Sequence, residues 1–402
     1  AKCGELSKAK QILSELPVRN VITWSALILR YAQQGHGEDA LECFESMQKD
    51  GLSPNAITYA CILKACGSPR VIEKGKKIHD EVMNKGMLTD VVIGTALVDM
   101  YARCGELKTA RGVLDELPVH NIATWNALIS GYAQSGLAHE ALKCFRQIED
   151  EGVCPDAVTY ICILKACAIG GSLEIGECID ARIRRFWLSE KDLMLGNALV
   201  DMYSKCGALK RAQEVFELLP DQNVVSWSAL IGGYVQNGLG DEALKCFREM
   251  KDAGVYPDVV TYVSILKACG LKGCLEIGED IDSNVRKKGL LEKDIMLGTA
   301  VVDMYCKCGV MEKAQQVFNQ LPTRGVMSWN SLIAGYIQNG LGNEALKCVE
   351  QMKDTRVEPD KVTYVYIMKA CGIMRSIEIA EDIHMKVRKQ GLLDNDVILG
   401  NA

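Results

Sequence analysis

The chain has 402 residues, with 46 Lys and Arg against 52 Asp and Glu, a formal net charge of −6, and 48% hydrophobic residues. It lacks the overall basic excess by which most nucleic-acid-binding proteins attract phosphates, so any such function has to come from local placement of charge. No apolar run of 18 or more residues and no basic-then-apolar leader occurs, which excludes a membrane span or a visible targeting peptide. Because the first residue is Ala1 rather than Met, we expect a piece of a longer gene product.

The chain repeats itself about every 102 residues. Tryptophans recur at this interval, and so do three series of cysteines: Trp24, Trp125, Trp227, Trp329; Cys3, Cys104, Cys206, Cys308; Cys43, Cys144, Cys246, Cys348; and Cys66, Cys167, Cys269, Cys371. A thiol that recurs alone at one place of a repeated unit is predicted to be a small buried hydrophobic residue. No Cys-x-x-Cys occurs, so we expect neither a metal nor a cofactor.

Each unit predicts three helical hairpins in chain order. Apolar residues with helical spacing run from Trp24 to Tyr31, and after a glycine-containing break a second amphipathic stretch covers residues 38–49. The same pattern returns over residues 56–90 and, in a shorter form, over residues 91–121. The hairpins measure 35, then 35 or 36, then 31 residues, and no strand pattern remains. Stacked hairpins of this size predict one all-α superhelical solenoid with a concave groove, not several domains.

At this point the sequence resembles a pentatricopeptide repeat protein of the plant PLS class, whose P, L and S repeats have these lengths in this order. The resemblance rests on Met-Tyr-Ala-Arg-Cys-Gly at 100–105, Leu-Lys-Ala-Cys at 63–66 and Trp-Asn-Ala-Leu-Ile-Ser-Gly-Tyr at 125–132. It implies a right-handed solenoid of P-L-S triplets at 21–121, 122–223 and 224–325, then P and L repeats at 326–396. Partial S repeats occupy 1–20 and 397–402. A tetratricopeptide array would instead show a uniform 34-residue period.

The resemblance implies that the fifth and last residues of each P and S repeat recognise one RNA base. These base-reading pairs are Ser25 and Asn55, Thr95 and Asn121, Asn126 and Asp156, Asn197 and Asn223, Ser228 and Asp258, Thr299 and Gly325, and Asn330 and Asp360. In the L repeats the fifth residues are apolar: Ala60, Ile161, Val263 and Val365. This change of chemistry with repeat type favours base recognition, because a generic structural position would not change so regularly. The alternatives are that the fifth residues are helix N-caps and that the last residues cap the helix that follows.

Asn can donate and accept, Asp only accepts, and a hydroxyl does either, so two such groups can recognise a Watson–Crick edge. The family's code, carried over pair by pair, implies the target 5′-A-n-A-U-n-C-G-n-R-U-n-3′, where n stands for an L repeat. The purine R is loose because Gly325 has no side chain.

Two further sets of residues are expected to contact RNA. The second residues of the P and S repeats are implied to stack on bases, although apolar positions on helices are core residues by default: Ile22, Val92, Ala123, Met194, Val225, Met296, Met327. Lysines stand one helical turn beyond the fifth residue of every L repeat and are expected to contact phosphates: Lys64, Lys165, Lys267, Lys369. Pairing of these lysines with the equivalent S-repeat residues Asp99, Asp201 and Asp303 is an equally good explanation.

Relatives of this class often end in a DYW cytidine deaminase, whose zinc site needs His-x-Glu and a distant Cys-x-x-Cys. His79-Asp-Glu81 matches the first half by coincidence, so we expect no enzyme in this chain. The predicted function is sequence-specific binding of single-stranded RNA that directs C-to-U editing, a form of mRNA processing, in a plant mitochondrion or chloroplast. Organellar editing cofactors or a DYW deaminase are further expected partners. The alternative is a protein-binding scaffold that docks editing cofactors.

Overall fold

The computed structural model describes residues 6–15, 19–186, 192–376, 381 and 385. These residues form twenty-two α helices and one 3-10 helix and include no strand, so the predicted all-α class is confirmed. The chain divides into two compact units, Ala1–Pro220 and Asp221–Ala402, and each is described by itself. Cys3 and the expected partial repeat at 397–402 lie outside the described residues.

Each repeat opens with a first helix whose N-terminal residue is the first residue of that repeat. After the N-terminal helix α1 (Leu6–Glu15), the first helices are α2 (Val21–Gln33), α4 (Ala56–Ala65), α6 (Val91–Arg103), α8 (Ile122–Gln134), α10 (Ala157–Gly170), α12 (Leu193–Lys205), α14 (Val224–Gln236), α16 (Val259–Lys272), α18 (Ile295–Lys307), α20 (Val326–Gln338) and α22 (Lys361–Met374).

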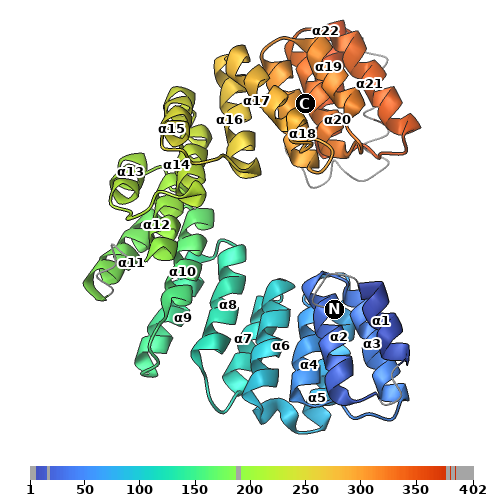
Figure 1. The fold of residues 1–402 in the computed structure, drawn as a ribbon, viewed down its shortest axis with the longest axis vertical. Helices are drawn as coiled ribbons and strands as arrows, with labels where there is room; N and C mark the ends of the chain where they lie inside the picture. Colours follow the sequence, from blue (N-terminus) through green and yellow to red (C-terminus); the bar gives the residue numbers. More distant parts are fainter. Residues whose placement is uncertain (1–5, 16–18, 187–191, 377–380, 382–384, 386–402) are drawn as a thin grey trace. The chain divides into compact units, whose positions relative to one another are not determined.

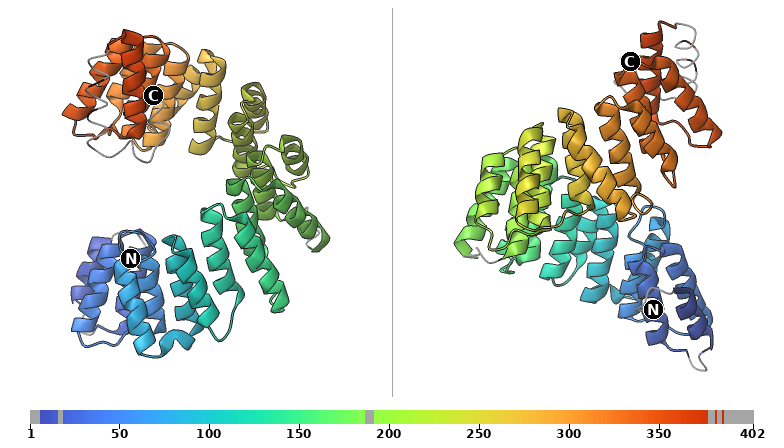
Figure 2. Two further views of the ribbon diagram at one scale, coloured as in Figure 1. Left: turned by 180° about the vertical axis from the view of Figure 1, so that it is seen from behind. Right: turned by 45° about the horizontal axis from the view of Figure 1, so that its top comes forward.

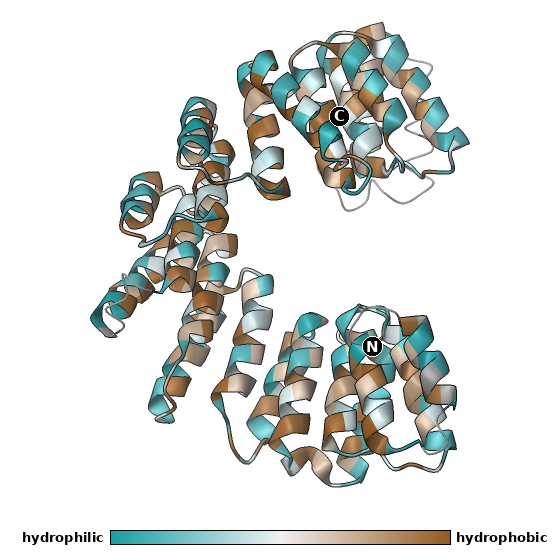
Figure 3. Cartoon of the chain, viewed as in Figure 1, coloured by the Kyte–Doolittle hydropathy of each residue, from teal (hydrophilic) through white to brown (hydrophobic). Residues whose placement is uncertain are grey.

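The second helices complete the hairpins. They are α3 (Gly37–Lys49), α5 (Ile72–Asn84), α7 (Leu107–Glu116), α9 (Ala138–Asp150), α11 (Leu173–Phe186), α13 (Leu209–Glu217), α15 (Gly240–Asp252), α17 (Leu275–Lys287), α19 (Met311–Gln320) and α21 (Gly342–Asp354), and the 3-10 helix η1 (Met87–Thr89) follows α5. Hydrophilic and hydrophobic residues alternate along these helices (Figure 3), as expected for elements that cover a core on one side.

Within each unit the first helices stack in chain order (Figures 1 and 2). In unit 1 each first helix contacts the next one from α2 to α12, and in unit 2 the same holds from α14 to α22. Each second helix packs on the first helix of its own hairpin. The four tryptophans of the repeated series are buried between these layers. Each unit is therefore a solenoid of hairpins in which a repeat contacts mainly its neighbours.

Local sequence signals explain where the helices begin and turn. An Asn or Asp precedes ten of the eleven first helices, and its side chain accepts hydrogen bonds from backbone N–H groups of the first turn. The hairpin turn after α2 passes through Gly35 at φ +78°, a left-handed conformation that glycine adopts without steric cost. No helix among the described residues is both long and apolar enough to cross a membrane.

The recurring cysteines divide into two structural classes. The series beginning with Cys43 and Cys66 are buried, and burial raises the pKa of Cys66 to about 12. Cys104, Cys206 and Cys308, expected to be buried, are only half-buried, because each thiol lies at the end of the preceding L-repeat helix and donates to a carbonyl oxygen there. The acceptors are Cys66 O at 3.5 Å, Cys167 O at 3.5 Å and Cys269 O at 3.8 Å.

Candidate nucleic-acid interface

The structure brings the fifth and last residues of several repeats into direct contact. Asn126 Nδ2 donates to Asp156 Oδ1 at 3.0 Å in unit 1, and Asn330 Nδ2 donates to Asp360 Oδ1 at the same distance in unit 2. Ser228 Oγ lies 3.4 Å from Asp258 Oδ1. Residues thirty positions apart in the sequence thus form small polar sites along the first helices.

Every last residue with a side chain in these pairs caps the helix that follows. Oδ1 of each cap accepts from a backbone N–H group three residues later, at 2.8–3.1 Å. The acceptors are Asn55, Asn121, Asp156, Asn223, Asp258 and Asp360, and the donors are, in the same order, Thr58, Thr124, Thr159, Ser226, Thr261 and Thr363. Capping, considered above as an alternative to base recognition, is therefore a real role of these side chains.

Capping uses only one of the two polar atoms at the end of each side chain. The second atom, Nδ2 in Asn55, Asn121 and Asn223 or Oδ2 in the aspartates, makes no hydrogen bond within the described part of the chain. Because Oδ1 must accept from the backbone, the cap also fixes which way the Asn amide points. The outer atom is thus a donor in Asn and an acceptor in Asp, and capping leaves it available for a further partner.

The two Asp caps paired with Asn are held in the charged form. Burial disfavours the charge on Asp156, but hydrogen bonds from the Thr159 backbone, from Asn126 and from the Thr159 hydroxyl together lower the pKa of its carboxyl below the ordinary value. The same balance lowers the pKa of Asp360 beside Asn330 and Thr363. Both outer oxygens are therefore hydrogen-bond acceptors at neutral pH.

The fifth residues lie in the second turn of the first helices and are not N-caps, so that alternative is wrong. Ser25, for example, is the fifth residue of α2, whose N-cap is Asn20. Asn197 lies on α12 in unit 1 and Asn223 caps α14 in unit 2, so this pair belongs to separately described units. Thr299 is buried, and Gly325 begins α20 without any side-chain cap.

A third group of side chains holds the fifth residues in place, and the sequence predictions did not include it. Threonine hydroxyls three residues after five of the caps hydrogen-bond the preceding fifth residue: Thr58 to Ser25 at 2.8 Å, Thr124 to Thr95 at 2.8 Å, Thr159 to Asn126 at 2.7 Å, Thr261 to Ser228 at 2.6 Å and Thr363 to Asn330 at 2.7 Å. Ser226 and Ser328 instead donate to the carbonyl oxygens of Asn223 and Gly325. The signal was present as a Thr or Ser at the third place of every P and L repeat.

This third place also changes with repeat type. In the S repeats, which follow the L repeats, it holds the fully buried Ile93, Leu195 and Leu297. When the fifth residue of a repeat is polar, the third residue of the next repeat is therefore polar too. When the fifth residue is apolar, the third residue of the next repeat is apolar. The change of chemistry at the fifth place thus has a packing counterpart, and it does not by itself separate base recognition from structure.

The second residues are exposed on the first turn of the first helices. Ile22 is 76% exposed, Met194 70% and Met327 67%, and Val92, Ala123, Val225 and Met296 are exposed as well. The default expectation that these apolar residues belong to the core is wrong. Each lies three residues before the fifth residue of its own repeat, within one helical turn, so an apolar surface borders every polar site.

The four L-repeat lysines are exposed and form no ion pair among the described residues. The S-repeat aspartates pair instead with a cation one turn further along their own helices: Asp99 with Arg103 at 3.8 Å, Asp201 with Lys205 at 2.8 Å and Asp303 with Lys307 at 2.6 Å. Burial raises the pKa of Asp99, while the charges of Arg103 and Lys64 oppose this. The positive charge of Lys64, Lys165, Lys267 and Lys369 is therefore not neutralised by a direct partner.

Residues that resembled half of a deaminase motif take part in packing. His79 Nδ1 lies 3.0 Å from the Tyr101 hydroxyl, and burial lowers the pKa of this histidine. Glu81 accepts from the hydroxyl of Tyr59 and from Lys85, both at 2.7 Å. Among the described residues no three His, Cys, Asp or Glu side chains gather as metal ligands do.

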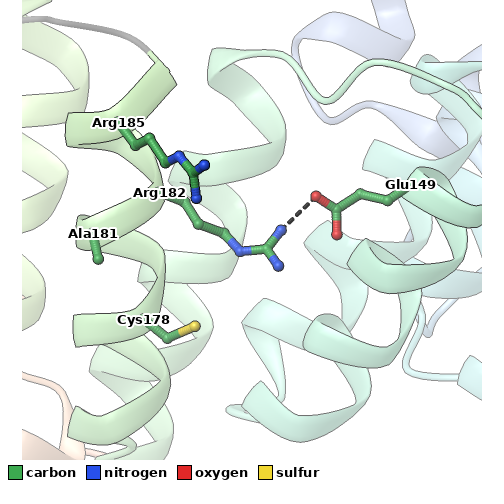
Figure 4. Close-up of a pocket in the computed structure, with 5 residues that line it drawn as sticks. All are labelled: Glu149, Cys178, Ala181, Arg182 and Arg185. Atoms are coloured by element: carbon green, nitrogen blue, oxygen red, sulfur yellow. Dashed lines mark hydrogen bonds and ion pairs between the residues drawn. The ribbon is translucent and has the colours of Figure 1, made fainter.

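A shallow pocket lies on another face of unit 1, between the second helices α9 and α11 (Figure 4). Glu149, Cys178, Ala181, Arg182 and Arg185 line it, and the ion pair of Arg182 with Glu149 spans it. It contains no acid–base pair or nucleophile with an adjacent base, so it has none of the features of a catalytic site.

Comparison with known proteins gives consistent matches along the chain. The family described as "PPR repeat family" matches residues 19–68, 120–169, 222–270 and 324–372, and "PPR repeat" matches residues 95–122, 197–224 and 299–326. A chloroplastic pentatricopeptide repeat-containing protein of Arabidopsis thaliana is 36% identical over 95% of this chain and 61% of its own length. A mitochondrial one is 33% identical over 99% of this chain and 38% of its own length.

Solved structures share the fold. The crystal structure of the pentatricopeptide repeat protein PPR10 in complex with an 18-nucleotide psaJ RNA element matches with a TM-score of 0.67 and 21% identity, covering 94% of this chain and 58% of that chain. The crystal structure of the pentatricopeptide repeat protein PPR10 from maize matches with a TM-score of 0.54 and 19% identity, covering 96% of this chain and 67% of that chain. The chain spans about half the length of the curated relatives it matches.

Proposed function

Because the chain belongs to the pentatricopeptide repeat family, we propose that it binds single-stranded RNA, one nucleotide per repeat, through its base-reading pairs. One base per repeat is the mode already known for this family. The observation that carries the proposal concerns the two polar atoms of each capping Asn or Asp. One atom caps the helix, and the outer atom, beside the fifth residue, has no partner among the described residues. An RNA base would supply the missing partner for that outer atom.

The surroundings of the outer atoms suit a nucleotide. The exposed second residue of each P and S repeat offers an apolar surface within one helical turn of the fifth residue, on which a base can stack. The unpaired L-repeat lysines offer positive charge once in three repeats, which suits a phosphate backbone. An RNA of sequence 5′-A-n-A-U-n-C-G-n-R-U-n-3′ is the ligand we propose.

The proposed role in the cell is to mark a site for C-to-U editing in an organelle transcript. This chain would supply recognition, while a DYW deaminase or organellar editing cofactors would supply the chemistry. A mitochondrial or chloroplast location is proposed because the similar proteins include a chloroplastic and a mitochondrial one.

A titration with fluorescently labelled RNA at one fixed salt concentration tests the proposal. The proposed RNA is compared with variants that change one assigned position at a time, and each change should weaken binding by about 1–3 kcal/mol. Changes at the positions marked n should have much smaller effects. Equal binding to a scrambled RNA of the same composition would overturn sequence-specific recognition. No binding to any RNA would favour the protein-binding scaffold.

A further inference from the structure

Two half-buried cysteines of unit 2 hydrogen-bond the same backbone oxygen at the end of one helix. Helix α16 ends at Lys272, and the backbone N–H of Cys274 donates to Cys269 O at 3.0 Å. The thiol of Cys308, at the end of α18, donates to the same oxygen at 3.8 Å. The Cys269 oxygen therefore accepts one hydrogen bond from the backbone of Cys274 and one from the thiol of Cys308.

This arrangement occurs once among the described repeats, although its framework recurs. In the second triplet Ser172 donates its N–H to Cys167 O at 3.0 Å and Cys206 donates its thiol to the same oxygen at 3.5 Å. The geometry is thus the same, but Ser172 stands where the third triplet has Cys274. The chain contains its own one-thiol control.

The neighbouring sulfur atoms differ in their access to a reagent. Cys269 is fully buried, and burial together with nearby Cys274 and Cys308 raises the pKa of its thiol to about 12. It therefore stays protonated and covered at neutral pH. Cys274 and Cys308 are both partly exposed. Burial and the neighbouring Cys274 raise the pKa of Cys308, so its reaction should accelerate as the pH rises.

We propose that Cys274 and Cys308 form a redox-active dithiol that is oxidised to an intramolecular disulfide by low-molecular-weight disulfides such as glutathione disulfide. One protein thiolate attacks the S–S bond of the reagent, forms a mixed disulfide and releases one glutathione thiolate. The second protein thiolate then attacks the protein sulfur of the mixed disulfide and releases the second glutathione. Two protein thiols are oxidised, one glutathione disulfide is reduced, and the two protons lost by the protein thiols end on the two released glutathione thiols. The bond would join the L repeat at 259–294 to the S repeat at 295–325.

Equilibration of the full chain in glutathione redox buffers of increasing oxidation, followed by alkylation and peptide mass spectrometry, tests this proposal. We expect a peptide linking Cys274 to Cys308, two hydrogen masses lighter than the sum of its parts, in monomeric protein. Cys154 and Cys178 are exposed single thiols and report that the reagent has acted. Glutathione on these two residues without a Cys274–Cys308 link would overturn the proposal, and so would a link to Cys269 or between two chains.

The two triplets supply matched variants. Cys274→Ser introduces the residue that the second triplet already has at this place, so it should fold and should leave Cys308 with at most a mixed disulfide. Ser172→Cys should create a second dithiol with Cys206 and a second linked peptide. Failure of Ser172→Cys to yield that peptide, in protein whose Cys154 is modified, would show that the shared carbonyl geometry does not predict the bond.

Discussion

A single capping side chain carries two separable roles in this chain. Its inner atom begins a helix, and its outer atom is left with a donor or acceptor character that depends only on whether the residue is Asn or Asp. If the chain binds RNA as proposed, a substitution that keeps the cap should therefore change base preference without unfolding the repeat.

The chain contains both an Asn–Asp and a Ser–Asp pair, which allows a reciprocal exchange. Asn126→Ser should move the preference at its repeat from U to G, because Asp156 still accepts while the smaller hydroxyl leaves room for a purine. Ser228→Asn should move its own repeat from G to U. Each single variant should lose about 1–3 kcal/mol on the proposed RNA, as measured by RNA titration. The double variant should regain that affinity on RNA with both bases exchanged, and unchanged binding of either variant to both RNAs would show that the repeat register is wrong.

Gly325 offers the converse experiment, in which a side chain is added. Its backbone is extended, at φ −86° and ψ 173°, and a Cβ would meet nothing within 4 Å. Gly325→Asn should cap α20, raising stability by a few tenths of a kcal/mol, and should narrow the purine preference beside Thr299 to A. Gly325→Asp is the matched control, with a similar cap but a preference for G. The same preference in both variants, with a raised melting temperature, would mean that the cap forms but the outer atom does not contact a base.

At the scale of one helix, the sequence predicts beginnings well and side-chain networks poorly. The Asn and Asp caps act on the first turn of the helix that they precede, so their spacing alone places helices such as α4 and α10. The bonds of Thr58 to Ser25 and of Thr159 to Asn126 join side chains 33 positions apart, and they depend on how one hairpin stacks on the next. The pairing of Asp201 with Lys205 in preference to an L-repeat lysine depends on rotamers that no residue spacing specifies.

Comparison of equivalent hairpins also identifies a contact that one of them lacks. In the second P repeat the buried indole of Trp125 donates to Glu151 at 3.2 Å, and His120 lies 2.9 Å from the same carboxylate. In the fourth P repeat Trp329 Nε1 is buried without a partner, and the place of Glu151 is taken by exposed Thr355. A carboxylate there would also face Arg324, which occupies the place of His120.

Thr355→Glu should therefore stabilise unit 2 by about 1 kcal/mol, the net contribution of one buried hydrogen bond, and thermal unfolding should record a rise of a few degrees. Thr355→Gln, which can accept from the indole without a charge, should keep most of the gain. Glu151→Ala should have the opposite effect in unit 1. Equal melting temperatures for Thr355→Glu and the parent chain would argue that Trp329 is already satisfied, for example by water.

At the scale of the whole chain, a net charge of −6 is compatible with RNA binding only if the groups near the RNA are locally positive. On the first helices of the S repeats Asp99, Asp201 and Asp303 are balanced by their own cations. The exposed L-repeat lysines are left as a positive series that recurs once in each triplet.

Log affinity falls as log salt concentration rises. Replacement of Lys64, Lys165, Lys267 and Lys369 by Gln should make this slope shallower by about 0.7 per contact, or nearly 3 in total. The loss should be similar for all RNA sequences, since phosphates carry no base identity. The melting temperature should hardly change, because these side chains form no ion pair among the described residues. Replacement of Lys143, Lys245 and Lys347, exposed on second helices, is the control for a general charge effect. An unchanged slope for the fourfold variant would refute phosphate contact.

The shared cap has a consequence for how such chains can be recombined. Since the last residue of one repeat caps the first helix of the next, a junction placed at the repeat boundary keeps each base-reading pair together but joins the next helix to a foreign cap. A graft that crosses over within a second helix, such as α9, keeps the cap with its helix but separates the fifth residue Asn126 from its partner Asp156. A crossover just after the third residue of a first helix, such as Thr159, keeps the fifth residue, its partner and the hydroxyl that bonds both on one side of the junction. The exchangeable cassette of this protein is therefore offset from its repeat by about one helical turn.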